Sequence, residues 1–349
     1  MRGGPRRDAF DGLRTVLVMG VMIHHLQWTL GHVDPLAAAG WLPVDGFFVL
    51  SGYLIATNLL SELDSAGSIS VGRFLARRLA RLYPALLVVL AAIGVVSLLV
   101  DDRSWSATWP SLASSASYLH NFTNLDGLDV FGFGSMLFEV GPLWSLSIEF
   151  QFYVALPFVF IGLAAAGLPR RAWLGIVVAT GVASAAWRTS SGIDGYPRSY
   201  LFTPMRLDSL MWGVALALLA RSGALARVPV TSARVVGAGA TLVLLALYFT
   251  ASAYEPATYQ WGITVAGLAS AGLVGALVRD PDSIGSRLLS LAPLAALGRR
   301  SYSAYLWHQA VFLLLVHHAG LGGWSFAVAG IALTRGCSPT SPTGSWNDR

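Results

Sequence analysis

Residues 8–30, DAFDGLRTVLVMGVMIHHLQWTL, form the first long apolar run of the chain and indicate its class of fold. This apolar run is about as long as a helix that crosses a bilayer, and it is interrupted by Arg14 and by the pair His24 and His25. Eleven residues separate Arg14 from His25, close to three helical turns, so both side chains lie on one helix face. The helical rise places them roughly 16 Å apart in depth. We therefore predict a membrane helix with one ionisable face.

A histidine inside a bilayer needs a physical reason, because ionisable groups there are costly and usually face a cavity or a partner. One interpretation is a functional His25 that faces such a cavity. The other is a purely structural hydrogen bond to a neighbouring helix, which polar side chains between spans often make. This stretch alone leaves both interpretations open.

The composition excludes a soluble protein. Of the 349 residues 55% are hydrophobic and only 12% are charged, whereas a soluble domain is about a quarter charged. The net charge of +5 comes from arginines in short loops between apolar runs, which favours topology signals over a nucleic-acid surface. All basic residues are Arg, which is typical of a GC-rich bacterial genome, and the single Cys337 excludes an intrachain disulfide. We predict an all-α polytopic transmembrane bundle in the cell membrane.

About ten spans account for residues 1–334, and a polar, disordered tail follows at residues 335–349. We expect no appended soluble domain and no cleavable signal peptide. The segment 109–122 is too polar for a span and is expected to be re-entrant or interfacial. The expected spans are 12–30, 41–60, 83–100, 143–167, 172–187, 207–220, 234–253, 260–278, 302–318 and 324–334.

Arginine sets the predicted orientation. With the N-terminus inside, every arginine except four falls on the cytoplasmic side, as the positive-inside rule requires. We therefore predict that both the N-terminus and the C-terminus are cytoplasmic. The four outer arginines are Arg103, Arg188, Arg198 and Arg206.

Few ionisable residues lie inside the predicted spans, and four of them fall in the outer half: His25, Asp45, Glu149 and Asp208, the last with Arg206 beside it. Glu149 could orient His25 as a general base that takes a proton from a hydroxyl. The alternative for Glu149 is a protonated structural carboxyl paired with Ser or Tyr. The glycines that follow Asp45, Gly46 and Gly52, favour close helix packing.

Other charged motifs lie toward the cytoplasmic side. In RFLARRLARLYPALL (residues 73–87) Arg78 and Arg81 share a helix face, which suits bidentate phosphate contacts or a topology-setting patch that faces lipid. LGRRSYSAYLWHQAV (residues 297–311) places His308 about 10 Å into the last long span. The sequence has no HExxH or other closely spaced ligand set, so we predict no metal site.

Six segments together resemble the acyltransferase-3 family of integral-membrane O-acyltransferases. The resemblance spans about 300 residues in the order typical of that family. Two departures are Phe10, where the family usually has an aliphatic residue, and the C-terminal end, where the last span is short and lacks the usual acidic-Arg-Pro ending. The matching segments are DAFDGLR (8–14) with His25, VDGFFVLSGYLI (44–55), RRLARLYP (77–84), PLWSLSIEFQFYVALP (142–157), RLDSLMWG (206–213) and LGRRSYSAYLWH (297–308).

The resemblance implies a ten-helix core that takes an acyl group from cytoplasmic acyl-CoA, a co-substrate, with no bound cofactor. The acceptor would be a hydroxyl of a sugar, on a glycan or on a glycosylated metabolite. By motif match His25 would be the catalytic histidine, Arg14 its paired arginine and Glu149 the acidic residue, while Arg78 and Arg81 would handle the donor. The remaining polar residues are expected to face the acceptor or to be structural: Asp45, Arg206, Asp208 and His308.

The alternative function is a carrier that moves a polar metabolite or a lipid-linked sugar across the membrane. Buried charge and polar sites on two sides would serve a carrier equally well. Transporters often have duplicated halves with broken helices at matching positions, and we find no such duplication in this sequence. An enzyme is therefore favoured.

Overall fold

The computed structural model describes residues 5–30, 39–40, 42–99, 104–123, 137–192, 198–252 and 255–319. Within these ranges the regular secondary structure is helical and includes no strand, which confirms the all-α prediction. Helices occupy nine of the ten expected spans, and the tenth, 324–334, lies outside the described residues together with the expected tail. The elements are α1 (Pro5–Thr29), α2 (Pro43–Ala66), α3 (Val71–Leu99), α4 (Trp105–Ala116), η2 (His120–Phe122), η3 (Phe138–Leu143), α5 (Trp144–Ala165), α6 (Arg170–Ser191), α7 (Arg198–Leu201), η4 (Thr203–Met205), α8 (Leu207–Arg221), α9 (Ala224–Arg227), α10 (Val230–Thr250), η5 (Thr258–Gly262), α11 (Ile263–Arg279), α12 (Ile284–Leu289), α13 (Ala292–Gly298) and α14 (Ser301–Ala319).

Within the described residues, five helical segments are long and apolar enough to cross a membrane: α2, α3, η3 with α5, α10, and η5 with α11. Large apolar side chains are exposed on their surfaces, for example Val88 on α3, Phe158 on α5 and Leu242 on α10. Apolar surface of this kind suits contact with lipid. These findings indicate a membrane protein, while the count of ten spans stays a prediction.

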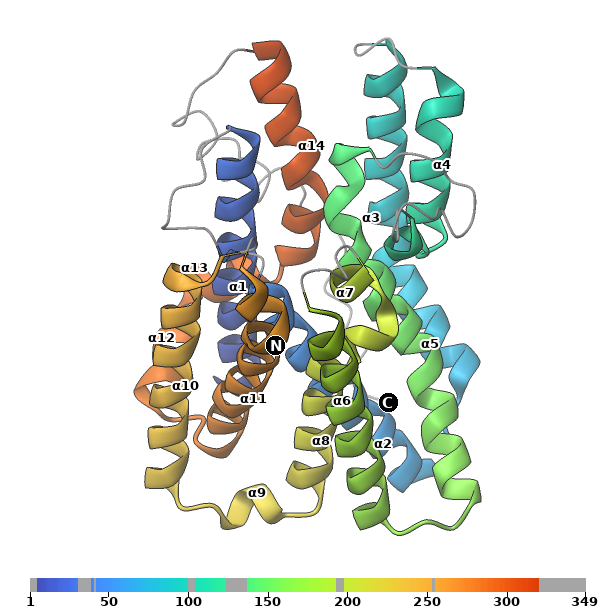
Figure 1. Cartoon of the computed structure of the whole chain (residues 1–349). Helices are drawn as coiled ribbons and strands as arrows, with labels where there is room; N and C mark the ends of the chain where they lie inside the picture. The colour runs from blue at the N-terminus through green and yellow to red at the C-terminus, as the bar shows by residue number, and fades with distance from the viewer. Residues whose placement is uncertain are drawn as a thin grey trace.

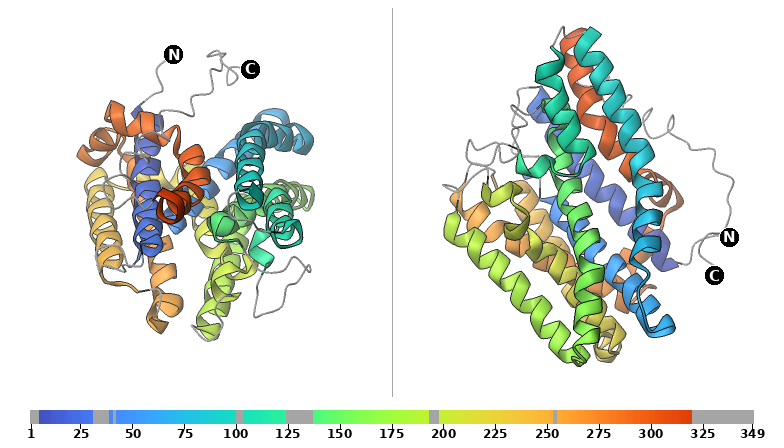
Figure 2. Two further views of the ribbon diagram at one scale, coloured as in Figure 1. Left: turned by 90° about the horizontal axis from the view of Figure 1, so that it is seen from above. Right: turned by 90° about the vertical axis from the view of Figure 1, so that its right-hand side faces the viewer.

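The bundle places distant parts of the sequence side by side (Figure 1). The central helix α2 packs against α8 and α11, and α8 packs against α6. The first helix, α1, packs against α12, α13 and α14, so the two ends of the described chain meet. Seen from above in Figure 2, α3, α4 and α5 gather on one side, opposite α10 and α12. The segment expected to be re-entrant or interfacial forms α4, which packs against α3, and η2, which packs against α5.

Glycines allow the closest helix contacts in the bundle. A Cβ atom on Gly52 of α2 would lie 2.2 Å from the carbonyl oxygen of Leu210, and one on Gly213 of α8 would lie 2.1 Å from the carbonyl oxygen of Val49. A Cβ atom on Gly46 would lie 2.7 Å from the side chain of Leu17 on α1. Small residues let the helix backbones approach to contact distance. The packing role predicted for Gly46 and Gly52 is confirmed.

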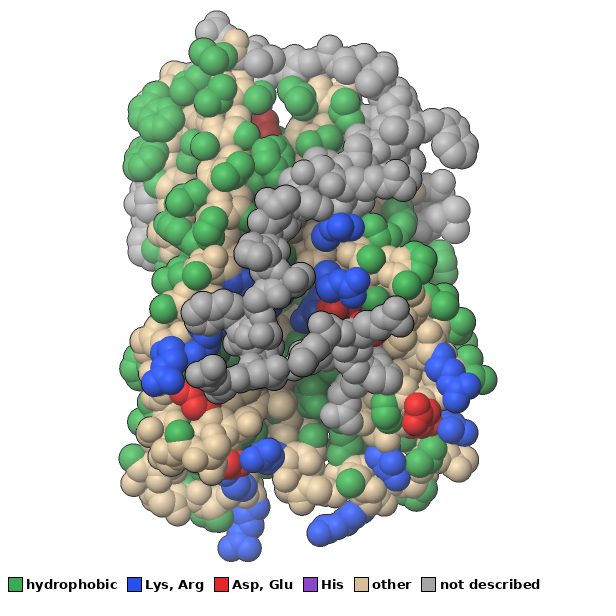
Figure 3. Space-filling model, turned by 180° about the vertical axis from the view of Figure 1, so that it is seen from behind, with side chains coloured by type: hydrophobic (Ala, Val, Ile, Leu, Met, Phe, Trp, Pro, Cys, Tyr) green, Lys and Arg blue, Asp and Glu red, His purple; other side chains and the backbone are tan. Residues whose placement is uncertain are grey.

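Charge is distributed unevenly along the bundle. On the face drawn in Figure 3, most arginine and acidic side chains lie in the lower half and hydrophobic side chains cover the upper part. Asp64, near the end of α2, pairs with Arg170 at 2.8 Å and with Arg221 at 2.7 Å. The α5–α6 turn and α9 lie at the same, lower end in Figure 1. We call this the arginine-rich end of the bundle; which side of the membrane it faces stays a prediction.

Candidate active site

The first polar cluster joins α1 to α14 through two imidazole rings. His25 Nδ1 lies 2.8 Å from His308 Nε2, and the rings are stacked with their centroids 5.0 Å apart. His308 is fully buried at 0% exposure, whereas His25 is half-buried. His25 is therefore the less buried residue of the pair.

The histidine pair continues into α5 through a tyrosine. His308 Nδ1 donates to the carbonyl oxygen of Tyr305 at 2.6 Å, which is a contact within α14. The Tyr305 hydroxyl lies 2.7 Å from the Ser145 hydroxyl and donates to the carbonyl oxygen of Pro142 at 2.5 Å. We call His25, His308, Tyr305 and Ser145 the histidine cluster.

The second cluster surrounds Glu149, one turn after Ser145 on α5. The carboxylate of Glu149 accepts hydrogen bonds from the hydroxyls of Ser51 and Tyr153. The guanidinium of Arg78 lies 5.7 Å from the centroid of the Tyr153 ring. We call Glu149, Ser51, Tyr153 and Arg78 the glutamate cluster. These two hydroxyl contacts are the ones expected if Glu149 is a structural carboxyl paired with Ser or Tyr.

The two clusters follow one another along α5. From Ser145 to Tyr153 the helix advances about 12 Å toward the arginine-rich end. Arg78 approaches Tyr153 from α3, within two turns of the start of that helix. Polar groups thus extend from the half-buried His25 to the half-buried Arg78 through the interior of the bundle.

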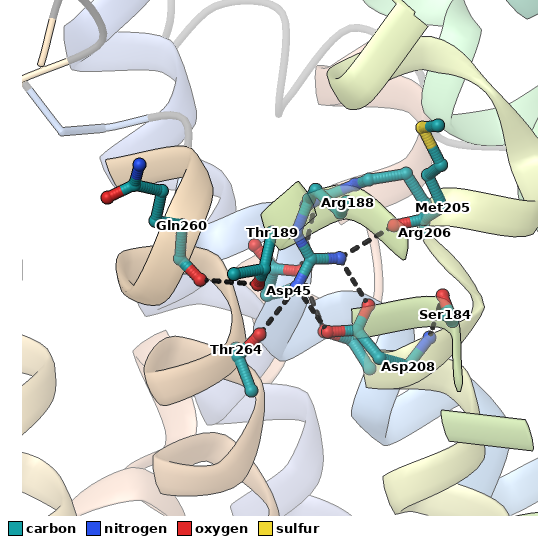
Figure 4. Close-up of polar contacts among 10 residues, drawn as sticks. Asp45, Ser184, Arg188, Thr189, Met205, Arg206, Asp208, Gln260 and Thr264 are labelled. Atoms are coloured by element: carbon teal, nitrogen blue, oxygen red, sulfur yellow. Dashed lines mark hydrogen bonds and ion pairs between the residues drawn. The ribbon is translucent and has the colours of Figure 1, made fainter. Parts of the chain in front are cut away.

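The third cluster is a buried pair of ions between α6 and α8 (Figure 4). Arg188 donates to both oxygens of Asp208, with Nη1–Oδ1 at 2.9 Å and Nη2–Oδ2 at 2.7 Å. The same guanidinium reaches the carbonyl oxygen of Met205 and the hydroxyl of Thr264, each at 2.6 Å. Both charged side chains have 0% exposure. A bidentate ion pair that is shielded from solvent is typical of a structural contact between helices.

A second buried ion pair lies beside the first. Arg206 Nη2 donates to Asp45 Oδ1 at 3.1 Å, and the Ser209 hydroxyl donates to the same oxygen at 2.7 Å. The Arg206 guanidinium also lies over the rings of Phe48 and Tyr200, at 5.8 and 5.1 Å. The four charged residues are fully buried, and we call Asp45, Arg188, Arg206 and Asp208 the ion-pair cluster.

Arg14 has a carboxylate as its neighbour. Its Nη1 donates to Asp11 Oδ1 at 2.5 Å, and Nη1 of Arg299 lies 3.9 Å from Asp11 Oδ2 and 3.8 Å from Asp8 Oδ1. Arg14 is therefore half-buried beside α13, about three turns from His25. On α3, Arg81 is exposed. Among the residues that the structure describes, no group of three His, Cys, Asp or Glu side chains could hold a metal ion.

The family comparison identifies the type of domain. The sequence model of the acyltransferase-3 family, described as an acyltransferase domain, matches residues 7–339. The chain belongs to this family. All three clusters lie within the matched region.

Among known proteins, this acyltransferase-3 chain is similar to the peptidoglycan O-acetyltransferase OatA of Listeria monocytogenes, with 33% identity over 88% of the chain and 49% of the relative. It is also similar to the O-acetyltransferase OatA of Staphylococcus aureus, with 30% identity over 87% of the chain and 50% of the relative. The chain thus spans about half the length of the curated relatives that it matches. No solved structure matches it.

The structure brings together some of the residues singled out in this family member and separates others. His25 meets His308, and Asp45 meets Arg206, whereas Asp208 pairs with Arg188, a residue that the sequence indicated only as an outer arginine. The hydrogen-bond partners of Glu149 are Ser51 and Tyr153, and the partner of His25 is His308.

Sequence reasoning missed Tyr305 and Arg188 as parts of buried clusters. Tyr305 stands one turn before His308, and this spacing could have indicated a shared helix face. Arg188 stands three residues before the end of an apolar helix, and an arginine at this position indicates a residue at the membrane interface. Only the packing of α6 on α8 shows that it is buried.

Proposed function

We propose that this protein is a membrane O-acyltransferase that moves an acetyl or other short acyl group from cytoplasmic acyl-CoA to a hydroxyl of a sugar. The family match and the O-acetyltransferase relatives support O-acyl transfer. The name of the Listeria relative, which refers to peptidoglycan, supports a glycan as the acceptor; a glycosylated metabolite is the other acceptor class.

The observation that carries this proposal is the pairing of a half-buried His25 with a fully buried His308. A histidine held by a second group and accessible on one side is the arrangement that a general base requires. His25 also stands in the motif that resembles the catalytic histidine of the family. We therefore assign the base to His25.

In the proposed reaction, His25 takes the proton from the acceptor hydroxyl as the hydroxyl oxygen attacks the thioester carbonyl carbon. The carbon–oxygen bond forms, the carbon–sulfur bond breaks, and the CoA sulfur leaves as a thiolate that takes up a proton. A second route has His25 carry the acyl group briefly before the hydroxyl attacks. Arg14, about three turns from His25, would bind the donor at a point away from the reacting carbonyl.

The donor would enter from the arginine-rich end, which this proposal places in the cytoplasm. Arg78 and Arg81 would bind the phosphates of CoA, because guanidinium groups suit bidentate contacts with phosphate. The polar groups from Arg78 through Glu149 to the histidine cluster would line the route of the acyl group. The acceptor would approach His25 from the opposite side.

The first test uses the purified protein in proteoliposomes, supplied with several acyl-CoAs and a crude extract of glycans and glycosylated metabolites. Release of CoA is followed for the wild type, His25→Ala and the neighbouring control His24→Ala. We expect His25→Ala to lower the rate by about 10²- to 10⁴-fold and the control to stay near the wild-type rate. Mass spectrometry of the extract would identify the acylated acceptor. A correctly inserted His25→Ala protein that acylates at the normal rate would refute the assignment.

The donor site has a separate test. Replacing Arg78 and Arg81 by alanine should raise the KM for acyl-CoA, because the phosphate contacts are lost, and should leave the KM for the acceptor unchanged. Arg221→Ala, an exposed arginine at the same end of the bundle, serves as the control. An unchanged KM for acyl-CoA in the Arg78 and Arg81 variant would contradict the placement of the donor.

A further inference from the structure

We propose that His308 is a positioning residue that fixes which nitrogen of His25 is basic. The inference rests on the proposed function of His25. It assigns a role to His308, which the sequence left as either a contact for the acceptor or a structural residue. The His308 ring makes two polar contacts. One ring nitrogen faces a carbonyl oxygen and the other faces His25.

The first contact sets the tautomer of His308. The carbonyl oxygen of Tyr305 can only accept a hydrogen bond, so His308 Nδ1, 2.6 Å away, carries the proton. In a neutral imidazole the other nitrogen, Nε2, is then an acceptor. A doubly protonated His308 would place a charge at a site with 0% exposure, where its described contacts are the carbonyl oxygens of Tyr305 and Ala304, a second imidazole and the rings of Tyr305 and Phe312. Such burial strongly favours the neutral ring.

The second contact determines which nitrogen of His25 carries the proton. Because His308 Nε2 accepts, His25 Nδ1, 2.8 Å away, must be the donor and therefore carries the proton. The proton of a neutral His25 then resides on Nδ1, so Nε2 has the free lone pair. A general base needs that lone pair directed at the substrate hydroxyl. His308 itself is fully buried and cannot touch a substrate without rearrangement of α14.

A neighbouring contact holds the backbone of the same turn. The Thr29 hydroxyl donates to the carbonyl oxygen of His25 at 2.7 Å, and Gln309 Nε2, next to His308 in sequence, lies 3.4 Å from that hydroxyl. Successive residues of α14 thus contact the ring of His25 and, through Thr29, its backbone. This double contact fixes the ring orientation as well as the tautomer.

A spectroscopic experiment tests the tautomer without any substrate. The protein, labelled with ¹⁵N in histidine, is observed by NMR, and His25→Ala identifies the His25 signals. We expect a protonated Nδ1 and an unprotonated Nε2 on His25, with a coupling across the hydrogen bond to His308 Nε2. In His308→Phe we expect the His25 proton to redistribute between its two nitrogens. A wild-type His25 that carries its proton on Nε2 would overturn the inference.

A kinetic experiment tests the consequence with two variants at one position. His308→Gln can place an amide oxygen near the former Nε2 and accept the His25 Nδ1 proton, whereas His308→Phe keeps a planar ring without an acceptor. We expect His308→Phe to lower kcat by about 100-fold with little change in KM, and His308→Gln to recover most of that loss. Equal rates in the wild type and in both variants would overturn the inference while leaving the role of His25 intact. Conversely, an inactive wild type with the expected His25 tautomer would refute the proposed function alone.

Discussion

The pair Arg188 and Asp208 joins three helices through two charges that are fully buried, with Thr264 as the contact on α11. Removing one partner leaves the other charge without compensation, which typically costs about 3–5 kcal/mol. We therefore expect Asp208→Leu to lower the thermal unfolding midpoint in detergent sharply. The double variant Arg188→Met with Asp208→Leu should recover much of the loss, because it removes both charges.

The exposed arrangement at the arginine-rich end provides the matching control. Arg221 and Asp64 also pair at 2.7 Å, but their side chains are 53% and 33% exposed. Water screens such a pair, so Arg221→Ala should cost about 1 kcal/mol or less. If Arg221→Ala and Asp208→Leu lowered the midpoint equally, burial would not determine the strength of these pairs.

His120 lies in η2, outside the membrane-spanning helices, and its ring is bonded to the Ser114 hydroxyl at 3.0 Å. Burial lowers the pKa of His120 to about 4, because the charged imidazolium would lose its hydration. The unfolded chain binds the proton near pH 6.5, so between about pH 6.5 and 4 only the unfolded state is protonated. Stability should therefore fall by about 3 kcal/mol as the pH is lowered through this window.

The measurement compares unfolding midpoints from pH 7 to pH 4 for the wild type and for His120→Asn, which keeps a polar partner for Ser114 but does not titrate. The wild type should lose stability relative to His120→Asn as the pH falls. Ser114→Ala, which keeps the imidazole, should retain the wild-type pH dependence. If the unfolding midpoints of the wild type and of His120→Asn fell in parallel with pH, protonation of His120 would not be the cause of the pH dependence.

At the scale of single residues, the sequence predicts which polar residues lie inside the bundle better than it predicts which residues they contact. The spacing and the apolar context single out His25 and Asp45 as buried polar residues, and the structure shows both in buried clusters. It does not predict that His308 reaches His25, because helical rise gives depth along one helix and no information on which helices are neighbours. Asp208 likewise pairs with Arg188 of another helix rather than with the nearby Arg206.

At the scale of helices, α2 and α8 make a close backbone contact at Gly52 and Gly213. A methyl group on Gly52 would lie 2.2 Å from the carbonyl oxygen of Leu210, which is backbone and cannot rotate away. Gly52→Ala should therefore separate the helices and cost about 1–3 kcal/mol, measured as a lower unfolding midpoint in detergent.

Gly239 of α10 gives the control for this prediction, since a methyl group there would meet nothing within 4 Å. Alanine at an open helical position removes conformational freedom from the unfolded chain, so Gly239→Ala should be neutral or stabilising by up to about 1 kcal/mol. A Gly52→Ala protein as stable as Gly239→Ala would show that the α2–α8 contact tolerates the added volume.

Helix positions follow from the sequence because each apolar run has its own length and ends. α2 begins with Pro43 and ends at Ala66, and Gly67, which follows, adopts the left-handed conformation, so local chemistry marks both boundaries. The short helices α12 and α13 were not predicted as separate elements. They form where the chain between two long helices packs against α1, and such tertiary contacts leave no periodic signal.

At the scale of the whole molecule, the uneven charge of the bundle has a consequence for its orientation. Arginines gather at one end of the structure, where Arg170 and Arg221 flank Asp64. Cytoplasmic loops of membrane proteins carry the excess of positive charge. We therefore expect the arginine-rich end to face the cytoplasm. The proposed entry of the donor from the cytoplasm and of the acceptor from outside both depend on this orientation.

The single cysteine of the chain provides a reporter for this prediction. Cys337 lies outside the described residues, in the segment that the sequence assigns to the cytoplasmic side. A membrane-impermeant maleimide should leave it unlabelled in intact cells and label it in inverted vesicles. In a Cys337→Ser background, Ala224→Cys in α9 should behave like Cys337, whereas Ser104→Cys, beside α4, should be labelled in intact cells. Labelling of Ala224→Cys from outside would show that the bundle has the opposite orientation. Arg78 would then face the acceptor side instead of the cytoplasm, where CoA is found.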